Sequence, residues 1–224
     1  MAICVLIPAY NESREIGPVV SAIKAKGFDV VVVDDGSTDN CGAIAKEKGA
    51  FVLRNVQRCG KGLSLREGFK HVLKGPYAGV IAMDGDGQHD PADLAQFLAK
   101  QEQDPVSVIT GNRMANSKDM PPVRYLTNCL MSFLISCVCK QRIPDTQCGF
   151  RYIHRQILQD LKMTCNDFEI ETEVLVKASK KGYKVHSVPI KTIYRDEKSK
   201  IRPLKDTVRF FRYLIREMTC RPSL

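Results

Sequence analysis

The chain has 224 residues, a length that suits one domain or one domain with a small appendage and that can bury a sizeable core. Hydrophobic residues make up 44% and charged residues 26%, which excludes a globally disordered chain. The net charge of +9 is concentrated at one end, because residues 177–224 hold fourteen Lys and Arg against four Asp and Glu. Such a basic end indicates a phosphate-rich or anionic-membrane partner, with a solvated surface as the alternative.

The nine cysteines indicate reduced thiols rather than disulfides. Their number is odd, they are scattered, and several lie within apolar runs, so we expect core residues of a cytosolic protein. A zinc site is disfavoured because the chain has no CxxC pair and its four histidines are far apart in the sequence. The first residues, MAICVLIPAYNE, run directly into a strand-like segment without a basic leader, so we expect no signal peptide.

Short apolar runs alternate with helical patterns along the first half of the chain. Continuous apolar runs predict strands covered on both faces at 3–9, 29–35, 50–55, 78–84 and 106–112. Helical patterns with capping signals lie between them, at 12–27, 37–49, 60–75 and 90–101. Asp90 is expected to cap the last of these helices, with Pro91 at its first position. The alternation predicts an α/β fold, a mostly parallel central sheet flanked by helices.

Acidic residues follow three of the predicted strands at their carboxyl ends, where ligands bind in such sheets. The first strand ends in PAYNE (8–12), the second in DDGSTD (34–39) and the fourth in MDGDGQHD (83–90). Three acidic strand ends on one rim would repel an anion unless a cation is bound there. Asp84 and Asp86 are two residues apart and can reach one hard cation, and oxygen ligands of this kind suit Mg²⁺ or Mn²⁺ that also coordinates substrate phosphates.

Other site motifs fit less well. An EF-hand starting at Asp84 fails at its sixth position, His89, and at its twelfth, Ala95. No GxGxxG follows the first strand and no GxxxxGK[ST] occurs, which disfavours a Rossmann dinucleotide site and a P-loop. The segment GKGLSLREG (60–68) offers backbone N–H groups and Lys61 to a phosphate, but an ordinary helix start with an exposed lysine has the same pattern. An Asp-Gly turn without a ligand is the remaining interpretation of MDGDGQHD.

Eight segments, in this order and spacing, resemble the inverting family 2 glycosyltransferases of the GT-A fold. Five of them are VLIPAYNES, VVVDDGSTDN, GKGLSLREGF, MDGDGQHDP and TGNRM. The later segments DTQCGFRYI, FEIETEVLVKASKKGYKVHSVPI and SKIRPLKD resemble the polyprenol-phosphate branch, typified by dolichol-phosphate mannose synthase and bacterial undecaprenyl-phosphate sugar transferases. The resemblance covers residues 3 to 212, nearly the whole chain, and implies a GT-A fold with a Rossmann-like N-terminal half.

The resemblance implies roles for particular residues, most of which lie in these segments. The nucleotide-sugar donor would be held by Pro8, Tyr10, Glu12, Asp34, Asp35, Lys61, Asp84 and Arg202. The metal, Mg²⁺ or Mn²⁺, would be held by Asp84, Asp86 and Gln88 and would act as a Lewis acid for the departing nucleoside diphosphate. The acceptor phosphate would be held by Arg113, Arg124 and Asn128, the last standing where many relatives have a serine. Asp86, Arg113 and Arg124 would be the catalytic residues, although a lone arginine is also compatible with plain surface charge.

The expected reaction is metal-dependent transfer of a sugar, with inversion, from a GDP- or UDP-linked donor to polyprenyl (dolichyl or undecaprenyl) phosphate. A phosphate acceptor is ionised at neutral pH and needs no general base, whereas a hydroxyl acceptor does. The chain has no tryptophan, so the QxxRW motif of processive polysaccharide synthases is absent. Two alternatives stay open. One is transfer to a glycan or protein hydroxyl, with Glu169, Glu171 or Glu173 as the base; the other is a non-catalytic sugar-nucleotide or membrane-binding module.

A polyprenyl phosphate lies in a membrane, so the predicted enzyme must reach one. No stretch approaches the ~20 apolar residues of a spanning helix, and the apolar segment 126–139 fits either a core helix or an interfacial helix. At the C-terminal end, Lys205, Arg209, Arg212 and Arg216 share one helical face, while Val208, Phe211, Leu214, Ile215 and Met218 cover another. This pattern is typical of a helix in the headgroup plane, and a docked C-terminal helix would share it.

The sequence therefore predicts a glycosyltransferase domain at 1–204, followed by a basic amphipathic helix and tail at 205–224. We expect a peripheral enzyme at the cytoplasmic face of a membrane, with an integral membrane partner as an option. A nucleic-acid partner is not expected, because the basic end carries no cluster of stacking aromatic residues. His89 receives no role from the sequence, and Glu171 receives one only in the hydroxyl-acceptor alternative.

Overall fold

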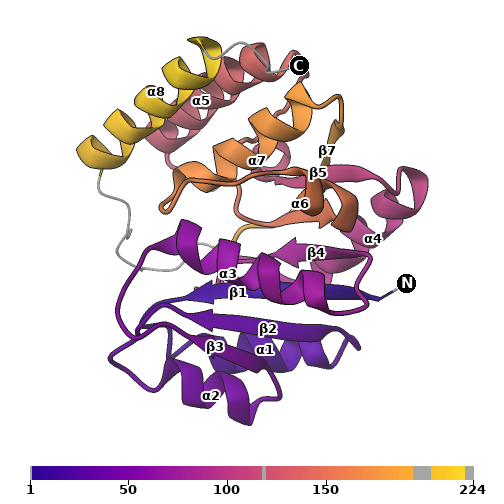
Figure 1. Ribbon diagram of the computed structural model, residues 1–224, viewed down its shortest axis with the longest axis vertical. Coiled ribbons are helices and arrows are strands. Elements are labelled where there is room, and N and C mark those ends of the chain that lie inside the picture. The colour runs from indigo at the N-terminus through magenta and orange to yellow at the C-terminus, as the bar shows by residue number, and fades with distance from the viewer. Residues whose placement is uncertain (1, 118–119, 194–202, 220–224) are drawn as a thin grey trace.

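A seven-stranded sheet runs through the part of the chain that the computed structural model describes, residues 2–117, 120–193 and 203–219 (Figure 1). In the last of these segments the side chains of 209–217 are described. The strands are β1 (Ile3–Ala9), β2 (Asp29–Asp34), β3 (Phe51–Arg54), β4 (Gly79–Ala82), β5 (Ser107–Asn112), β6 (Arg151–His154) and β7 (Lys184–Pro189). The first five match the strands predicted from the apolar runs.

Helices cover both faces of this sheet. They are α1 (Ile16–Lys24), α2 (Cys41–Glu47), α3 (Lys61–Lys74), α4 (Leu94–Gln103), α5 (Pro122–Cys139), α6 (Arg155–Asp160), α7 (Glu169–Lys180) and α8 (Pro203–Thr219), with 3₁₀ turns at Pro91–Asp93 and Arg113–Asn116. The predicted cap before α4 is confirmed, because the Asp90 carboxylate accepts a hydrogen bond from the backbone N–H of Ala92 at 2.8 Å. The α/β prediction is therefore confirmed.

The strand order is β3-β2-β1-β4-β6-β5-β7, and only β6 among these strands runs antiparallel to its neighbours. The sequence did not identify this strand. Because β6 is reversed, it starts at the edge of the sheet where β1, β2, β4 and β5 end. The segment that precedes β6, residues 140–150, is thereby brought to the edge that carries the acidic strand ends.

The central strands are buried on both faces, which explains their continuous apolar runs. In β1, Cys4 and Leu6 belong to the core cluster shared with α3 and α7, while Val5 and Ile7 belong to the cluster shared with α1 and α4. Successive side chains of a strand point to opposite faces, so each strand contributes to both cores. Two covered faces hold the loops at the carboxyl edge on a rigid support.

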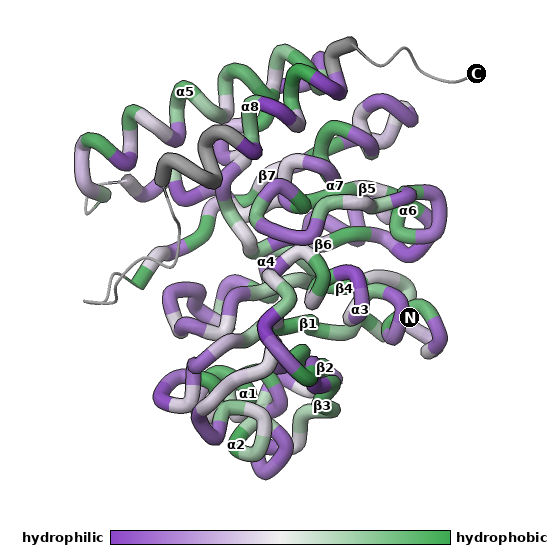
Figure 2. Tube along the Cα trace, turned by 60° about the vertical axis from the view of Figure 1, so that its left-hand side comes forward, coloured by the Kyte–Doolittle hydropathy of each residue, from purple (hydrophilic) through white to green (hydrophobic). Residues whose placement is uncertain are grey.

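Helix α5 lies at one end of the molecule and exposes one apolar face. Val123, Leu126 and Phe133 are 80%, 70% and 65% exposed, and Leu130 lies between them on the same face. The opposite face is buried through Ser132, Ile135 and Cys139. Figure 2 shows hydrophobic residues along the length of this helix. The predicted alternatives, a core helix or an interfacial helix, thus each describe one of its faces.

Helix α5 also starts four residues earlier than the predicted apolar segment 126–139. Within the described residues it is long and apolar enough to cross a membrane by length and composition, and 22% of it is buried. The helix has 18 residues, close to but below the ~20 apolar residues that the prediction took for a spanning helix. The helix gains that length from Pro122–Tyr125, where a proline at the first position supports the helix start.

Helix α8 packs on α7 through Phe210, Tyr213 and Leu214, which are buried in the core cluster. The predicted apolar face is therefore divided, because Leu214 points into the core while Phe211 and Ile215 stay exposed beside Arg212 and Arg216. The side chains of Lys205, Val208 and Met218 lie outside the described residues. The domain boundary at 204 stays a prediction.

Candidate active site

The loops after β1 and β2 are joined at the carboxyl edge of the sheet. Ala9 is the register partner of Asp34, so the two strands end side by side. Asn11, in the left-handed region with a φ of 55°, accepts a hydrogen bond from the backbone N–H of Thr38 at 2.9 Å. Its own N–H donates to the Ser37 hydroxyl at 3.0 Å. The first two polar strand ends therefore form one connected rim, as the sequence predicted.

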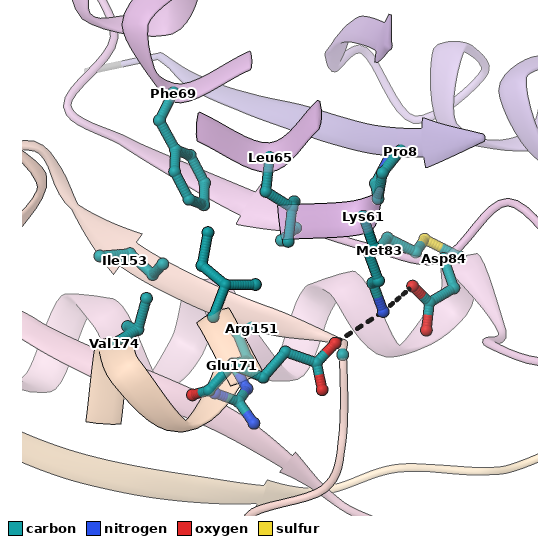
Figure 3. A pocket seen from close by; sticks show the side chains of 13 residues that line it. Pro8, Lys61, Leu65, Phe69, Met83, Asp84, Arg151, Ile153, Glu171 and Val174 are labelled. Atoms are coloured by element: carbon teal, nitrogen blue, oxygen red, sulfur yellow. Dashed lines mark hydrogen bonds and ion pairs between the residues drawn. The ribbon is translucent and has the colours of Figure 1, made fainter. Parts of the chain in front are cut away.

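Lys61 lies between two carboxylates in a pocket at this edge (Figure 3). Its Nζ atom is 2.6 Å from Oδ1 of Asp84 and 2.6 Å from Oε1 of Glu171. Pro8 lines the same pocket, and its deeper wall is apolar, formed by Leu65, Phe69, Ile153 and Val174. The structure thus brings Pro8, Lys61 and Asp84 together and adds Glu171, which had a role only in the hydroxyl-acceptor alternative.

The ion pairs keep this cluster charged. Burial alone would raise the pKa of Asp84, but Lys61 and His89 outweigh it and hold that pKa well below its usual range. Burial alone would lower the pKa of Lys61, but Asp84 and Glu171 outweigh it and raise that pKa. Lys61 is therefore a cation and Asp84 an anion throughout the physiological range.

The segment after Asp84 presents a second carboxylate. Oδ1 of Asp86 accepts a hydrogen bond from the backbone N–H of Gln88 at 3.0 Å, and the Gln88 carbonyl accepts one from Ile193 at 2.9 Å. A Cβ atom added to Gly149 would lie 2.6 Å from Oδ2 of Asp84. A residue without a side chain is thus needed where the 140–150 segment passes the Asp84 carboxylate.

These residues fit a hard divalent cation whose coordination is completed by a ligand. The carboxylates of Asp84 and Asp86 supply oxygen donors of the kind that Mg²⁺ and Mn²⁺ prefer. Residues 2–117, 120–193 and 203–219 contain no group of three or more His, Cys, Asp and Glu placed to hold a metal. The remaining ligands would have to come from elsewhere, and substrate phosphate oxygens are the common source for Mg²⁺.

His89 lies behind Asp84, where the sequence had given it no role. The ring is buried, with Nε2 3.5 Å from Oδ2 of Asp84, and it packs on Phe150 with 5.1 Å between ring centroids. Nδ1 is buried and has no hydrogen-bond partner in the described part of the chain. His89 therefore supports the second oxygen of Asp84 from inside the protein.

The Asp35 carboxylate is hydrogen-bonded to the loop between β3 and α3. Its carboxylate accepts hydrogen bonds at 2.9 Å from the side chain of Asn55 and from the backbone N–H groups of Cys59 and Gly60. These contacts hold the segment that leads into α3 and so place Lys61 at the first position of that helix. If Asp35 also binds the donor, as predicted, its carboxylate would have to do so while it accepts the hydrogen bonds of this loop.

The other residues predicted for the donor differ in exposure. Tyr10 is half-buried, with the Arg58 guanidinium 4.3 Å above its ring centroid. Glu12 is half-buried, and its carbonyl accepts from the N–H of Ile16 at the start of α1. Asp34 is fully buried and accepts a hydrogen bond from Ser37 at 2.8 Å, so it builds the turn rather than facing Lys61. Arg202 lies outside the described residues.

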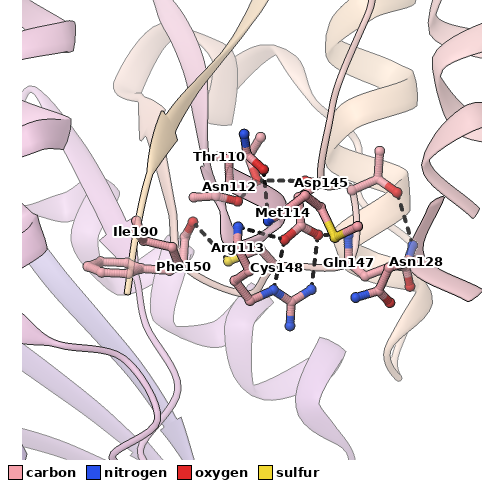
Figure 4. Close-up of polar contacts among 12 residues, drawn as sticks. Thr110, Asn112, Arg113, Met114, Asn128, Asp145, Gln147, Cys148, Phe150 and Ile190 are labelled. Atoms are coloured by element: carbon pink, nitrogen blue, oxygen red, sulfur yellow. Dashed lines mark hydrogen bonds and ion pairs between the residues drawn. The ribbon is translucent and has the colours of Figure 1, made fainter. Parts of the chain in front are cut away.

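Arg113 is bound by a carboxylate that the sequence reasoning missed (Figure 4). Its Nε lies 2.8 Å from Oδ2 of Asp145 and its Nη2 lies 2.9 Å from Oδ1, and Arg113 is only 7% exposed. Burial alone would lower the pKa of Arg113, but Asp145 outweighs it and raises that pKa. The predicted contact of Arg113 with an acceptor phosphate would therefore be made by a guanidinium that Asp145 already binds. Asp145 opens the motif DTQCGFRYI, which was the available signal.

Arg124 and Asn128 lie one turn apart at the start of α5. Arg124 is exposed, whereas Asn128 is buried with its amide 3.8 Å from the sulfur of Met120. One turn further on, the hydroxyl of Ser132 is 3.2 Å from that of Thr146. Helix α5 is thereby attached to the segment that carries Asp145.

Arg151 is a second arginine that sequence reasoning missed. It is buried, and its Nε and Nη2 donate to the carbonyls of Cys148 and Thr146, each at 2.6 Å. Its Nη1 donates to the carbonyl of Glu171. One guanidinium thus fixes the 140–150 segment against the start of α7, and so positions Gly149 and Glu171 around Lys61.

The α/β fold of the described residues matches solved structures of GT-A glycosyltransferases. The fold is shared with glucosyl-3-phosphoglycerate synthase from Mycobacterium tuberculosis, solved with Mn²⁺, uridine diphosphate and phosphoglyceric acid. That structure has a TM-score of 0.71 and 19% identity, over 97% of this chain and 77% of its own. The model of Glycosyl transferase family 2 matches residues 4–162, and the chain belongs to this family.

Two curated relatives are similar over most of the chain. Glycosyltransferase AglJ of Haloferax volcanii is 32% identical over 211 residues, covering 92% of this chain and 68% of its own. A UDP-N-acetylglucosamine–dolichyl-phosphate N-acetylglucosaminyltransferase of Methanococcus voltae is 29% identical over 217 residues, covering 87% and 86%. The predicted family, fold and enzyme class are confirmed, which removes the non-catalytic alternative.

Proposed function

We propose that this glycosyltransferase transfers a sugar, with inversion, from a nucleotide-sugar to a polyprenyl phosphate. The name of the Methanococcus voltae relative gives a UDP-sugar donor and dolichyl phosphate as acceptor, which supports the class of both substrates. The observation that carries the choice of a phosphate acceptor is the state of Glu171. Lys61 binds this base candidate at 2.6 Å, so its carboxylate is not free to deprotonate a hydroxyl.

The neighbouring acidic side chains are engaged as well. Glu173 is fully buried and accepts from Lys177 at 2.6 Å and from the backbone N–H of Thr164 at 2.9 Å. Glu169 has a weaker contact, because its Oε1 lies 4.0 Å from the guanidinium of Arg209 and its Oε2 is buried without a hydrogen-bond partner among the described residues. An ionised phosphate needs alignment and charge neutralisation instead of a base, which this set of residues supports better than hydroxyl chemistry.

On the donor side, the rim of β1 and β2 would hold the nucleotide through Pro8, Tyr10, Glu12 and the Asp34–Asp35 turn. Asp84, Asp86 and Gln88 would hold Mg²⁺ or Mn²⁺ on the diphosphate. When bound, the ion supplies Lewis-acid stabilisation of the leaving nucleoside diphosphate. Lys61 and the N-terminus of α3 would add positive potential beside the same phosphates, and Arg202 is a further proposed contact.

On the acceptor side, Arg124 would bind the phosphate from the start of α5, where it is exposed. Arg113 would contribute through Nη1, which has no hydrogen-bond partner among the described residues. Its field is weakened by Asp145, so Arg113 orients the phosphate more than it attracts it. Asn128 would contribute a neutral amide one turn along α5.

The membrane that carries such an acceptor would be met by α5 and α8. Both helices lie at the same end of the molecule in Figures 1 and 2. Helix α5 offers an apolar stripe, defined here as Val123, Leu126, Leu130 and Phe133, and α8 offers exposed Phe211 and Ile215 beside Arg212 and Arg216. Apolar side chains flanked by arginines suit the headgroup region of an anionic bilayer.

We propose that α5 lies along the membrane rather than across it. Ser132, Ile135 and Cys139 bury its other face in the domain, and a spanning helix would have to give up that packing. The enzyme would then be peripheral, at the cytoplasmic face, where an integral partner could strengthen the attachment.

A donor panel with the purified protein tests the reaction. UDP- and GDP-linked sugars are incubated with Mg²⁺ or Mn²⁺ and a short polyprenyl phosphate, and labelled lipid is separated from free sugar. We expect one donor to label the polyprenyl phosphate and none to label the matched polyprenol, which lacks the phosphate. Labelling of a glycan or peptide hydroxyl, with no labelling of the lipid phosphate by any donor, would overturn the proposal.

A further inference from the structure

Lys61 holds the carboxylate that the proposed function assigns to the metal. Its Nζ atom is 2.6 Å from Oδ1 of Asp84, while Oδ2 of the same carboxylate is 3.5 Å from Nε2 of His89. Both oxygens of Asp84 therefore face a nitrogen of the protein. An ammonium group occupies the side of Asp84 at which a divalent cation would bind Oδ1.

The ammonium and a divalent cation exclude each other at this carboxylate. The side chains of Lys61, Asp84 and Glu171 are 17%, 26% and 15% exposed, so water screens their charges only in part. A cation bound to Oδ1 would lie within a few ångströms of the Lys61 ammonium, where like charges repel strongly in a partly buried site. The negative charge of Glu171 does not remove this repulsion, because the Lys61 ammonium is bound to Glu171 and Asp84 at the same time.

A nucleoside diphosphate would relieve this conflict, since its phosphate oxygens offer new partners to both cations. Lys61 can reach them without movement of its backbone, because it is the first residue of α3 and Asp35 binds the N–H groups of Cys59 and Gly60 just before it. The side chain is long and flexible, so a change of rotamer suffices.

We propose that Lys61 is a placeholder cation, which neutralises Asp84 in the free enzyme and, while it keeps Glu171 as a partner, turns from Asp84 to the phosphates when the nucleotide arrives with its metal. The inference rests on the proposed metal role of Asp84 and is independent of the acceptor. Metal and nucleotide then bind as a coupled pair, and the coupling is reciprocal. The free enzyme keeps a neutralised site and binds the metal weakly.

Mn²⁺ binding without turnover tests this inference. Free Mn²⁺ is followed by electron paramagnetic resonance during titration of the protein, alone and with UDP or GDP. For the wild type we expect weak binding of Mn²⁺ alone and at least about tenfold tighter binding with the diphosphate, a factor within the usual range for coupled sites. Lys61→Met and Lys61→Gln should bind Mn²⁺ alone about tenfold more tightly than the wild type and gain less from the diphosphate.

Two controls assign the effect to the contact between Lys61 and Asp84. Lys70→Met removes an exposed lysine of the same helix, whose partner is Glu67 at 2.8 Å, and should leave Mn²⁺ binding unchanged. Asp84→Asn placed on Lys61→Met should abolish the gain in affinity. Circular dichroism and thermal unfolding establish that each variant is folded.

The results separate this inference from the proposed function. If folded Lys61→Met and Lys61→Gln bind Mn²⁺ alone no more tightly than the wild type, Lys61 has a structural role only and the inference is overturned. Equal affinity of the wild type for Mn²⁺ with and without the diphosphate, measured without any substitution, overturns it as well. Failure of every polyprenyl phosphate to accept a sugar would leave these Mn²⁺ titrations unaffected, so the two proposals fail in different experiments.

Discussion

Arg113 and Asp145 form a two-point ion pair at the carboxyl edge of the sheet, with Nε–Oδ2 and Nη2–Oδ1 distances of 2.8 and 2.9 Å. Asp145 also accepts hydrogen bonds from the backbone N–H groups of Arg113 and Gln147, each at 3.1 Å. A single carboxylate thus binds the end of β5 to the segment that precedes β6. The pair is structural first, and any contact of Arg113 with a ligand depends on it.

Asp145→Ala should destabilise the protein strongly. Removal of one partner of a buried pair leaves the other charge buried without compensation, which costs ~3–5 kcal/mol. Urea unfolding followed by circular dichroism measures the loss. Glu67→Ala, which removes the acidic partner of an exposed lysine, is the matched control and should cost about 0.5 kcal/mol or less. A loss below about 1 kcal/mol for Asp145→Ala would show that Arg113 is not held in this way.

Glu173 should make stability depend on pH in the acid range. Burial alone would raise the pKa of Glu173, but its bond with Lys177 outweighs it and lowers that pKa from 4.5. A carboxyl group whose pKa is lower in the folded state contributes stability that is present above the unfolded value and is lost as pH falls through the folded value. We therefore expect the free energy of unfolding to fall as the pH drops below about 4.5.

Glu173→Gln isolates this contribution. The variant should be less stable than the wild type at pH 7 and should lose less stability between pH 5 and pH 3, because the titrating group is gone. Urea unfolding at a series of pH values measures both slopes. Parallel curves for the variant and the wild type would assign the acid sensitivity to other carboxylates.

Asp86→Asn should remove activity while the fold persists. The Asp86 side chain is partly exposed, and its hydrogen bond within the described residues goes to the backbone N–H of Gln88, which an amide oxygen can also accept. The loss of one charged metal ligand should lower turnover by about 100-fold or more, the scale of a lost electrostatic contact at the reacting group. Thermal unfolding should shift little. Unchanged turnover would show that the metal assignment is wrong.

Leu126→Asp combined with Phe133→Asp should weaken binding to vesicles that contain anionic lipid. Each large apolar side chain contributes ~1.5–3 kcal/mol when fully buried, so even partial burial of two predicts a loss of about tenfold or more in partitioning. Co-sedimentation with vesicles measures it. Phe51→Asp is the matched control, since Phe51 is also exposed but lies on β3 at the opposite end of the molecule. Equal losses for the control would contradict a membrane role of α5.

Arg212→Glu together with Arg216→Glu tests the charge of the same surface. Both arginines are exposed on α8, so the exchange should weaken binding to anionic vesicles more than binding to neutral ones. The difference should shrink as salt is added, because exposed charges are screened. A salt-independent loss would mean that the exchange disturbs the packing of α8 on α7 instead.

Much of the fold could be predicted because its signals are local. Four of the first five strands are buried along continuous apolar runs, which follow from a sheet covered on both faces, whereas the edge strand β3 is partly exposed and so differs from the prediction. The cap at Asp90 could be predicted because it involves residues next to one another. Strand β6 escaped prediction, since a short strand has little periodicity and its antiparallel direction is decided by neighbours distant in sequence.

The candidate site divides in the same way. The acidic residues after β1, β2 and β4 could be located from the sequence, because parallel strands bring their carboxyl ends to one edge. Their partners could not be located, since Glu171 is 110 residues from Lys61 and Asp145 is 32 residues from Arg113. The sequence assigned Arg113 to the acceptor phosphate without its partner Asp145, because a motif shows that an arginine is present and not which carboxylate it binds.

By itself, the sequence determined the family, the α/β fold and the edge of the sheet that carries the candidate site, because these depend on periodicity and on ordered motifs. Only the tertiary structure decided which charges are already paired and which face of α5 is exposed. Charge pairing and burial depend on distances between segments that are far apart along the chain, and the reversed strand β6 sets those distances by bringing the 140–150 segment to Asp84. The placement of Lys61 between Asp84 and Glu171 follows from that arrangement.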